Sequence, residues 1–201
     1  MKKIFFIVTL ILIAIATTGA YHLTQQADIG YYQGHDRFVK SQYKASIPFF
    51  LKSLSHDPNR TQTLSELAYA FLWSGNQQEA ITVFQKLLSR EPGNARVRKS
   101  LAIAYSWNKE YAKAEALFLE AIRANEKDRD AQRELAEIYM WDNQFNKSKA
   151  ILAALLQSNP EDIRAKFLYG KALLYSGQTK EALKIFEELS GGSKKVTGKT
   201  P

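Results

Sequence analysis

The chain has 201 residues, of which 45% are hydrophobic, 24% charged and 12% aromatic, so it is long enough for one or two domains but too short for a large multidomain enzyme. It contains no cysteine, which excludes disulfides, thiolate metal sites and thiol nucleophiles. The formal net charge is +8, but the excess lies near the two ends and the middle is close to neutral, which argues against a continuous basic face for nucleic acid.

The first segment, residues 1–26, is predicted to be a hydrophobic leader helix. Two lysines precede an apolar run at residues 4–16, and small residues follow up to Ala20, an order typical of a secretory signal peptide. Since no charged residue lies between Lys3 and Asp28, the segment is also long enough for an uncleaved membrane anchor. In both cases the lysines stay in the cytoplasm, and we expect the rest of the chain to lie across the inner membrane, in the periplasm.

After the leader, the chain repeats itself with a period of 34 residues. An aromatic column at this spacing consists of Trp73, Trp107, Trp141 and Tyr175. Two columns of small residues keep the same register, namely Ala68, Ala102, Ala136 and Gly170, and Ala80, Ala114, Ser148 and Ala182. A column of large residues consists of Phe84, Phe118, Leu152 and Phe186. Several columns that agree on one period predict a repeated structural unit.

Each repeat is predicted to be a pair of helices. Large apolar residues three and four apart, such as Leu64, Leu67 and Phe71, predict the first helix. We expect the first helices to end at residues that tolerate left-handed backbone, which are Gly75, Lys109, Asn143 and Gly177. A second helix is expected over residues 79–89, and Pro92 prevents its continuation. Because one helical hairpin cannot bury its own apolar faces, the hairpins must stack.

This pattern resembles the tetratricopeptide repeat. The resemblance covers five repeats, at 27–60, 61–94, 95–128, 129–162 and 163–190. The first repeat matches least well, because Arg37 and Ser46 stand where the family has an aromatic residue and an alanine. The resemblance implies an all-α fold, a right-handed α-solenoid of about five helix hairpins after the leader, with the first helices lining a concave groove. Residues 191–201, rich in glycine and lysine, are predicted to be a disordered basic tail.

No catalytic motif occurs in the sequence. The three histidines are scattered, and there is no phosphate-binding loop, dinucleotide fingerprint or nucleophile elbow. We therefore predict that the protein is not an enzyme, that it needs no cofactor or metal, and that it binds no nucleic acid.

The resemblance implies that specificity lies in the groove. The candidate binding residues, at the positions that the family presents there, are Tyr69, Trp73, Arg96, Lys99, Ile103, Trp107, Arg133, Glu137, Trp141, Lys171 and Tyr175. The clamp by which some family members bind chaperone C-termini needs asparagine at the ninth position of the first helix. Tyr69, Ile103 and Glu137 stand there instead, so binding of chaperone C-termini is disfavoured.

Two features of the groove each have two interpretations. Arg96, Lys99 and Arg133 could form a cationic patch that binds a carboxylate, or they could be solvated surface neutralised by Glu134 or Glu137. The aromatic column could plug the elbows between neighbouring hairpins, or it could form an exposed stripe for an apolar helix or for sugar rings.

Three functions are open at this stage. The first is a non-enzymatic scaffold or adaptor of the cell envelope that binds a segment of a partner protein in the groove. The second is a module of an exopolysaccharide export or envelope-assembly system that contacts polysaccharide. The third is a self-associating homo-oligomer, which an uncovered outer side of Ala182, Ile185 and Leu189 in the last repeat would favour. An uncleaved leader would add the inner membrane as a partner.

Overall fold

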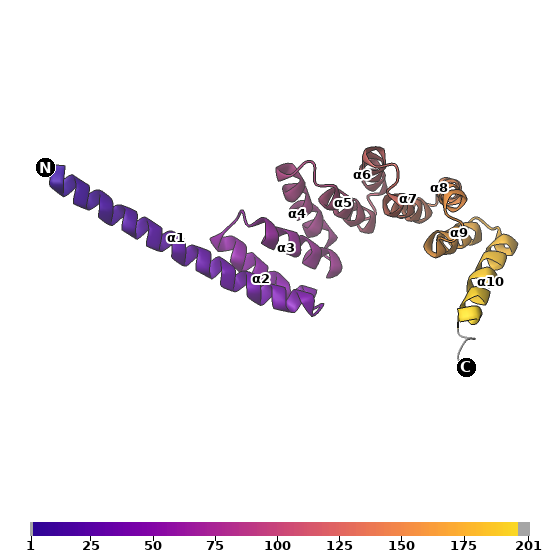
Figure 1. The fold of residues 1–201 in the computed structure, drawn as a ribbon, viewed down its shortest axis with the longest axis horizontal. Helices are drawn as coiled ribbons and strands as arrows, with labels where there is room; N and C mark the ends of the chain where they lie inside the picture. The colour runs from indigo at the N-terminus through magenta and orange to yellow at the C-terminus, as the bar shows by residue number, and fades with distance from the viewer. Residues whose placement is uncertain (1, 197–201) are drawn as a thin grey trace. The chain divides into compact units, whose positions relative to one another are not determined.

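The structure is a computed structural model that describes the backbone of residues 2–196 and the side chains of residues 9 and 11–191. The described backbone is entirely helical apart from short connections and contains no strand, so the predicted all-α class is confirmed (Figure 1). The helices are α1 (Lys2–Val39), α2 (Tyr43–His56), α3 (Thr61–Trp73), α4 (Gln77–Arg90), α5 (Ala95–Trp107), α6 (Tyr111–Ala124), α7 (Arg129–Trp141), α8 (Phe145–Ser158), α9 (Ile163–Tyr175) and α10 (Thr179–Val196).

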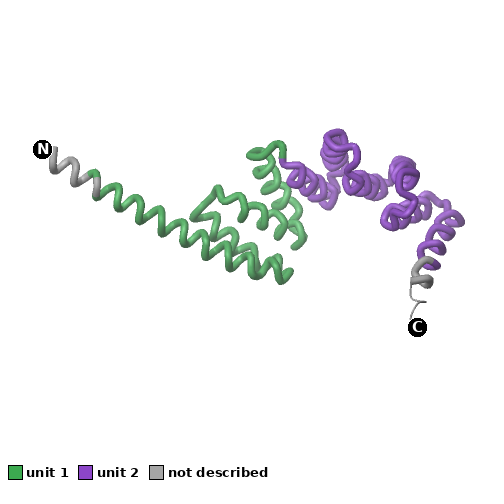
Figure 2. The backbone as a smooth tube through the Cα atoms, in the orientation of Figure 1, with its two compact units in different colours: residues 1–93 green, residues 94–201 purple. Residues whose placement is uncertain are grey.

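The helices fall into two compact units, which Figure 2 colours separately. Unit 1, residues 1–93, holds the hairpins α1–α2 and α3–α4, and α2 packs against α3. Unit 2, residues 94–201, holds the hairpins α5–α6, α7–α8 and α9–α10. Within unit 2 each second helix packs against the next first helix, and the first helices α5, α7 and α9 are neighbours in that order. Hairpins therefore stack in sequence within each unit, as the period of 34 residues predicts.

The columns of small residues lie at positions where helices pack closely. Every member of one column is fully buried, namely Ser46, Ala80, Ala114, Ser148 and Ala182. In the other column, a methyl group added at Gly170 would meet the Phe186 ring at 2.7 Å, so this position accepts only a very small residue. The complete burial of Ala182 contradicts our expectation that this residue faces outward. Ile185 and Leu189 are half-buried, and Leu183 is the large apolar residue that is exposed among the described side chains of α10.

The first helix of every repeat ends at a residue with left-handed backbone, as we predicted. The φ angles are 85° at Gly75, 62° at Lys109, 59° at Asn143 and 83° at Gly177. Ser41, at 58°, occupies the same repeat position in the first hairpin and was not foreseen. The residue after each of these donates its N–H to a carbonyl five residues back, as Asn76 does to Phe71 at 2.8 Å. This bond closes the end of the helix and turns the chain into the next one.

The predicted leader and the first helix of the first repeat form one continuous helix, α1. The side chains of residues 11–25 are exposed, whereas Ala27 is fully buried and its carbonyl accepts a hydrogen bond from Ser53 Oγ at 2.7 Å. Close packing in unit 1 therefore begins at Ala27, where the sequence pattern places the start of the repeats. Within the part of the chain that the structure describes, none of the helices has both the length and the apolar character needed to span a bilayer. The two leader lysines lie outside the described side chains.

At the other end, α10 continues to Val196, past the point at which we expected a disordered tail. A glycine inside a helix costs only about 1 kcal/mol relative to alanine, so the two glycines at 191 and 192 do not by themselves end the helix. The last part of the predicted tail, residues 197–201, lies outside the described residues.

We predict that Lys109→Gly raises the free energy of unfolding by about 0.5–1 kcal/mol, because glycine adopts left-handed backbone without the steric cost that a side chain incurs. Urea unfolding followed by circular dichroism measures the change. Lys109→Ala keeps the Cβ atom and is the control, so an equal gain in both variants would contradict the conformational explanation.

Candidate protein-binding surface

The predicted binding residues fall into both units. Tyr69 and Trp73 belong to α3 of unit 1. The remaining nine lie on the three first helices of unit 2, with Arg96, Lys99, Ile103 and Trp107 on α5, Arg133, Glu137 and Trp141 on α7, and Lys171 and Tyr175 on α9. Since α7 contacts both α5 and α9, these nine residues come from three adjacent helices. We call their shared surface the first-helix face of unit 2.

The aromatic column is half-exposed, and two of its members, Trp73 and Tyr175, also pack on the preceding hairpin. The exposed fractions are 46% for Trp73, 42% for Trp107, 43% for Trp141 and 56% for Tyr175. The Trp73 ring lies 4.9 Å from that of Tyr43, the first residue of α2. The Tyr175 ring lies 6.2 Å from that of Phe145, the first residue of α8. Trp73 and Tyr175 therefore each cover the elbow of the preceding hairpin, which is the turn between its two helices, with one part of the ring. Another part of each ring stays accessible.

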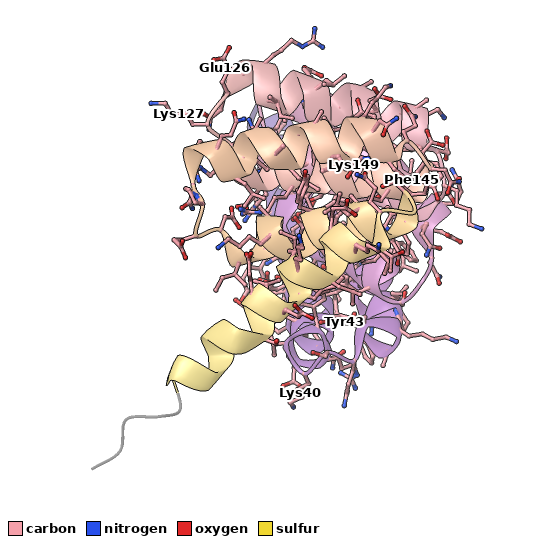
Figure 3. All side chains as sticks on the ribbon, turned by 90° about the vertical axis from the view of Figure 1, so that its right-hand side faces the viewer. Lys40, Tyr43, Glu126, Lys127, Phe145 and Lys149 are labelled. Carbon is pink, nitrogen blue, oxygen red and sulfur yellow. The ribbon has the colours of Figure 1, made fainter. Side chains whose placement is uncertain are left out.

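Two hollows lie beside these elbows, at the same position of the repeat. In unit 1 a hollow of about 360 Å³ is lined by residues 41–45 with Trp73 and Ser74. In unit 2 a hollow of about 500 Å³ is lined by residues 143–147 with Tyr175 and Ser176. Figure 3 labels Tyr43 and Phe145, the aromatic residues that begin the second helices at these elbows. The sequence analysis did not identify the hollows, although the aromatic residues at 43, 111 and 145 are one signal of them.

The cationic patch is engaged in ion pairs that join neighbouring hairpins. Lys99 Nζ lies 2.8 Å from an Asp128 carboxylate oxygen, and Arg133 lies 2.6 Å from Asp162 and also bonds to Asp130. Asp128 and Asp162 also cap the first turns of α7 and α9 by accepting backbone N–H groups. Lys99 and Arg133 are 34 residues apart, and so are Asp128 and Asp162. The same ion pair therefore occurs in two successive repeats.

The interpretation in which Glu134 or Glu137 neutralises the patch is wrong in its choice of carboxylates, because Asp128, Asp130 and Asp162 pair with Lys99 and Arg133. Glu134 and Glu137 instead form ion pairs with Arg164, whose Nη2 lies 2.8 Å from Glu134 Oε1 and 4.0 Å from Glu137 Oε2. Of the three patch residues, only Arg96 makes no ion pair within the described part of the chain, and it is exposed. A carboxylate of a partner would thus find one available cation in the patch rather than three.

Burial and neighbouring charges shift the pKa values of groups on this surface. For Asp128, burial acts to raise the pKa, but the Lys99 hydrogen bond and the Ala131 N–H outweigh it and lower the pKa below its usual range. For Glu137, burial together with the charge of Glu134 raises the pKa, against the opposing effects of Arg164 and Lys171. Glu137 is thus a partly desolvated carboxyl group that would gain from an additional donor.

Two exposed apolar residues extend the surface beyond the candidate residues. Phe167 is 50% exposed and Leu174 is 42% exposed, and both lie on α9. Lys171 lies on the same helix, with Nζ 5.8 Å from the centre of the Phe167 ring, within the range of a cation–π contact. Phe167 and Leu174 occupy positions that the tetratricopeptide repeat family presents in its groove. The resemblance alone could therefore have identified them as candidate binding residues. Among the described residues, no cluster of three or more His, Asp or Glu side chains could hold a metal ion.

The comparisons with known proteins concern mainly the fold. The sequence profile of the family described as tetratricopeptide repeat matches residues 74–138 and, one repeat later, residues 108–172. A crystal structure of MamA protein is similar with a TM-score of 0.69 and 24% identity, covering 88% of this chain and 97% of that one. MamA from Desulfovibrio magneticus RS-1 is similar with a TM-score of 0.72 and 18% identity, covering 86% and 98%.

A kinesin light chain repeat protein from Podosopora anserina is similar to a comparable degree. Its TM-score is 0.74 at 18% identity, and the match covers 89% of this chain and 99% of that one. No curated protein sequence matches the chain. At these identities the solved structures show a shared stack of helical hairpins and do not indicate a shared partner.

We predict that Asp128→Asn lowers the free energy of unfolding by about 1–2 kcal/mol at pH 7, because it removes a charged hydrogen bond between hairpins. The pKa of Asp128 is lowered in the folded state, so its contribution is present above the unfolded pKa of about 4 and is lost as the pH falls through the folded value. The variant should therefore lose less stability than the wild type between pH 6 and pH 3 in urea unfolding.

The control is Glu161→Gln, because Glu161 is 88% exposed and its ion pair with Lys166 is long, at 3.8 Å. Parallel stability–pH curves for Asp128→Asn and the wild type would contradict the assignment of the ion pair.

Proposed function

Since this chain is a tetratricopeptide repeat protein, a class that generally serves as a non-catalytic scaffold, we propose that it is a non-enzymatic adaptor that binds a segment of a partner protein on the first-helix face of unit 2. The observation that carries the proposal is the exposure of large apolar side chains there. Trp107, Trp141 and Tyr175 are each exposed by more than two fifths, and Phe167 and Leu174 add to them on α9. Tryptophan and tyrosine are the residues most often found as anchors in interfaces.

Polar groups beside these aromatics suit a peptide backbone and its side chains. Arg96 is an available cation on α5, and Glu137 is a partly desolvated carboxyl group on α7. Lys171 and Arg164 on α9 lie near Glu137 and give this part of the surface both signs of charge. An amphipathic segment could therefore place apolar side chains against the column and polar ones beside it.

The same exposure supports a second candidate, contact with polysaccharide in an export or envelope-assembly system. Sugar rings pack against exposed aromatic faces, and the column offers such a face at every repeat of unit 2. A self-associating homo-oligomer is the third candidate. Among the described side chains of α10, its support is the exposed Leu183 with the half-buried Ile185 and Leu189, since Ala182 is buried.

We also propose that the repeats lie outside the cytoplasm, in the cell envelope. The support is the sequence of the leader together with α1, whose side chains at residues 11–25 are exposed although many of them are apolar. The side chains of residues 11–25 contribute nothing to the described packing of unit 1, as expected of a segment that serves export or anchoring.

We predict that N-terminal sequencing of the chain, isolated from a bacterium that expresses it, begins near Tyr21 if the leader is a cleaved signal peptide. A start at Met1 in a membrane fraction would instead indicate an uncleaved anchor. A start at Met1 in the soluble cytoplasmic fraction would contradict the proposed location.

The adaptor proposal is tested with a peptide selected against the full chain from a displayed library, with binding measured by fluorescence polarisation. We predict that the double variant Trp107→Ala, Trp141→Ala weakens binding at least tenfold, because it removes two aromatic anchors. Leu183→Ala, which truncates an exposed apolar residue on α10, should leave binding unchanged. Circular dichroism should show the same helicity for all three proteins.

Unchanged affinity in the double variant would contradict the proposed surface. Polysaccharide binding is distinguished by adding oligosaccharides, which should then protect tryptophan fluorescence from acrylamide and displace the peptide. A hydrodynamic size that grows with protein concentration and falls in Leu183→Ala would instead favour self-association.

A further inference from the structure

A separate crevice lies in unit 2, between the second helices α6 and α8. It has a volume of about 590 Å³, within the usual range for small-molecule sites. Its walls are Leu119 and Ile122 of α6 and Ile151, Ala154 and Leu155 of α8. Leu135 of α7, only 1% exposed, lines it as well. None of these residues is among the predicted binding residues of the first-helix face.

The crevice exists because one repeat departs from the others. The position of Ala154 carries a charged residue in every other repeat, namely Lys52, Lys86, Glu120 and Glu188. A long charged side chain at this position would extend over the space that Ala154 leaves open. Leu119 likewise stands where the adjacent repeats have Gln85 and Ala153. The opening at Ala154 is thus particular to the junction between α6 and α8, whereas Ile122 and Leu135 belong to apolar columns that the repeat shares.

The mouth of the crevice carries a second departure at the same junction. Lys127 and Arg129 line it, together with Glu126 and Gln132. Neither position carries a basic residue in the other repeats. The residues equivalent to Lys127 are Asn59, Gly93 and Glu161, and those equivalent to Arg129 include Thr61, Ala95 and Ile163. Figure 3 labels Glu126 and Lys127 on the connection between α6 and α7.

The two cations are not used by the fold. Within the described residues neither Lys127 nor Arg129 makes an ion pair, in contrast to Lys99, Arg133 and Arg164 on the other face. The Gln132 amide donates to the Glu126 carbonyl at 2.9 Å and so fixes the connection that carries them. An apolar slot with two unpaired cations and one carboxylate at its mouth is complementary to an apolar chain that ends in an anion.

We propose that the α6–α8 crevice binds a single acyl chain with an anionic head group. The alkyl chain lies against Leu119, Ile122 and Ile151, and the head group is held by Arg129 and Lys127 at the mouth. A free fatty acid and a lysophospholipid both have this chemistry. The site is independent of the peptide-binding surface, so either proposal can fail without the other.

The test measures binding of dodecanoate to the full chain by isothermal titration calorimetry, below the concentration at which dodecanoate forms micelles. We predict saturable binding that Ala154→Glu weakens at least tenfold, because the new carboxylate fills and charges the slot. Since glutamate occupies the same position in two other repeats, this change suits the fold. Ala150→Glu, one turn earlier on α8 and exposed, is the matched control and should bind as the wild type does.

Chain length and charge supply further readouts. Each methylene removed from the chain should weaken binding about two- to fourfold. The double variant Lys127→Gln, Arg129→Gln should weaken dodecanoate about tenfold and leave dodecanol unchanged, since only the anion uses the cations. The control is Lys180→Gln with Lys184→Gln, two exposed residues of α10. If lysophosphatidylglycerol also binds and Ala154→Glu abolishes that binding, the ligand is a lysophospholipid. If dodecanoate binds and lysophosphatidylglycerol does not, the ligand is a free fatty acid.

Absence of saturable binding would overturn the proposal. So would equal binding by Ala154→Glu and the wild type, since that result would place the ligand on the exposed apolar part of α1 or elsewhere. A double variant that binds dodecanoate as tightly as the wild type would overturn the role assigned to the two cations.

Discussion

The structure depends on the inability of a single hairpin to cover its own apolar faces. Two helices of 13 or 14 residues bury too little surface to be stable alone, so within each unit a second helix packs against the next first helix. Small residues at fixed positions let the backbones approach, and large ones fill what remains, with Phe50, Phe84 and Phe118 almost completely buried. Removing such a phenylalanine would cost about 3–5 kcal/mol, so the columns tolerate little variation.

The same constraint fixes the parts of the chain outside the core. A hairpin that must dock at a set angle needs a defined turn, and the left-handed residues from Ser41 to Gly177 supply one in every repeat. Stacking in unit 2 also brings the start of one first helix close to the second turn of the preceding first helix. A carboxylate that caps α7 or α9 thereby reaches a cation on the neighbouring helix, as in the Lys99–Asp128 and Arg133–Asp162 pairs. The charged side chains of these pairs, on the first-helix face of unit 2, therefore serve mainly to join neighbouring hairpins.

The sequence predicted the periodic features well, because each appears several times and its physical reason is local. The left-handed helix ends follow from spacing and residue type, whereas the complete burial of Ala182 does not match the expectation that its outer side is uncovered. Features that depend on one contact between distant residues were missed. The partner of Lys99 is 29 residues away, and Arg164 rather than the patch takes Glu134. Arg37 stands where the other repeats have a large apolar residue, usually aromatic, which spacing alone does not explain. In the structure its guanidinium lies 3.9 Å from the centre of the Phe49 ring, in a cation–π contact.

In a repeat protein, departures from the repeat are more informative about function than the repeat itself. Ala154 leaves an opening where the other repeats carry charge, and Lys127 and Arg129 add cations beside it that no described residue pairs. None of these changes is required for stacking, since hairpins with other residues at these positions stack in the same unit. The aromatic column, in contrast, is periodic and therefore has a structural explanation at the elbows, yet every ring remains half-exposed. Selection for packing alone would favour burying those rings completely, so their exposure is the part that packing does not explain.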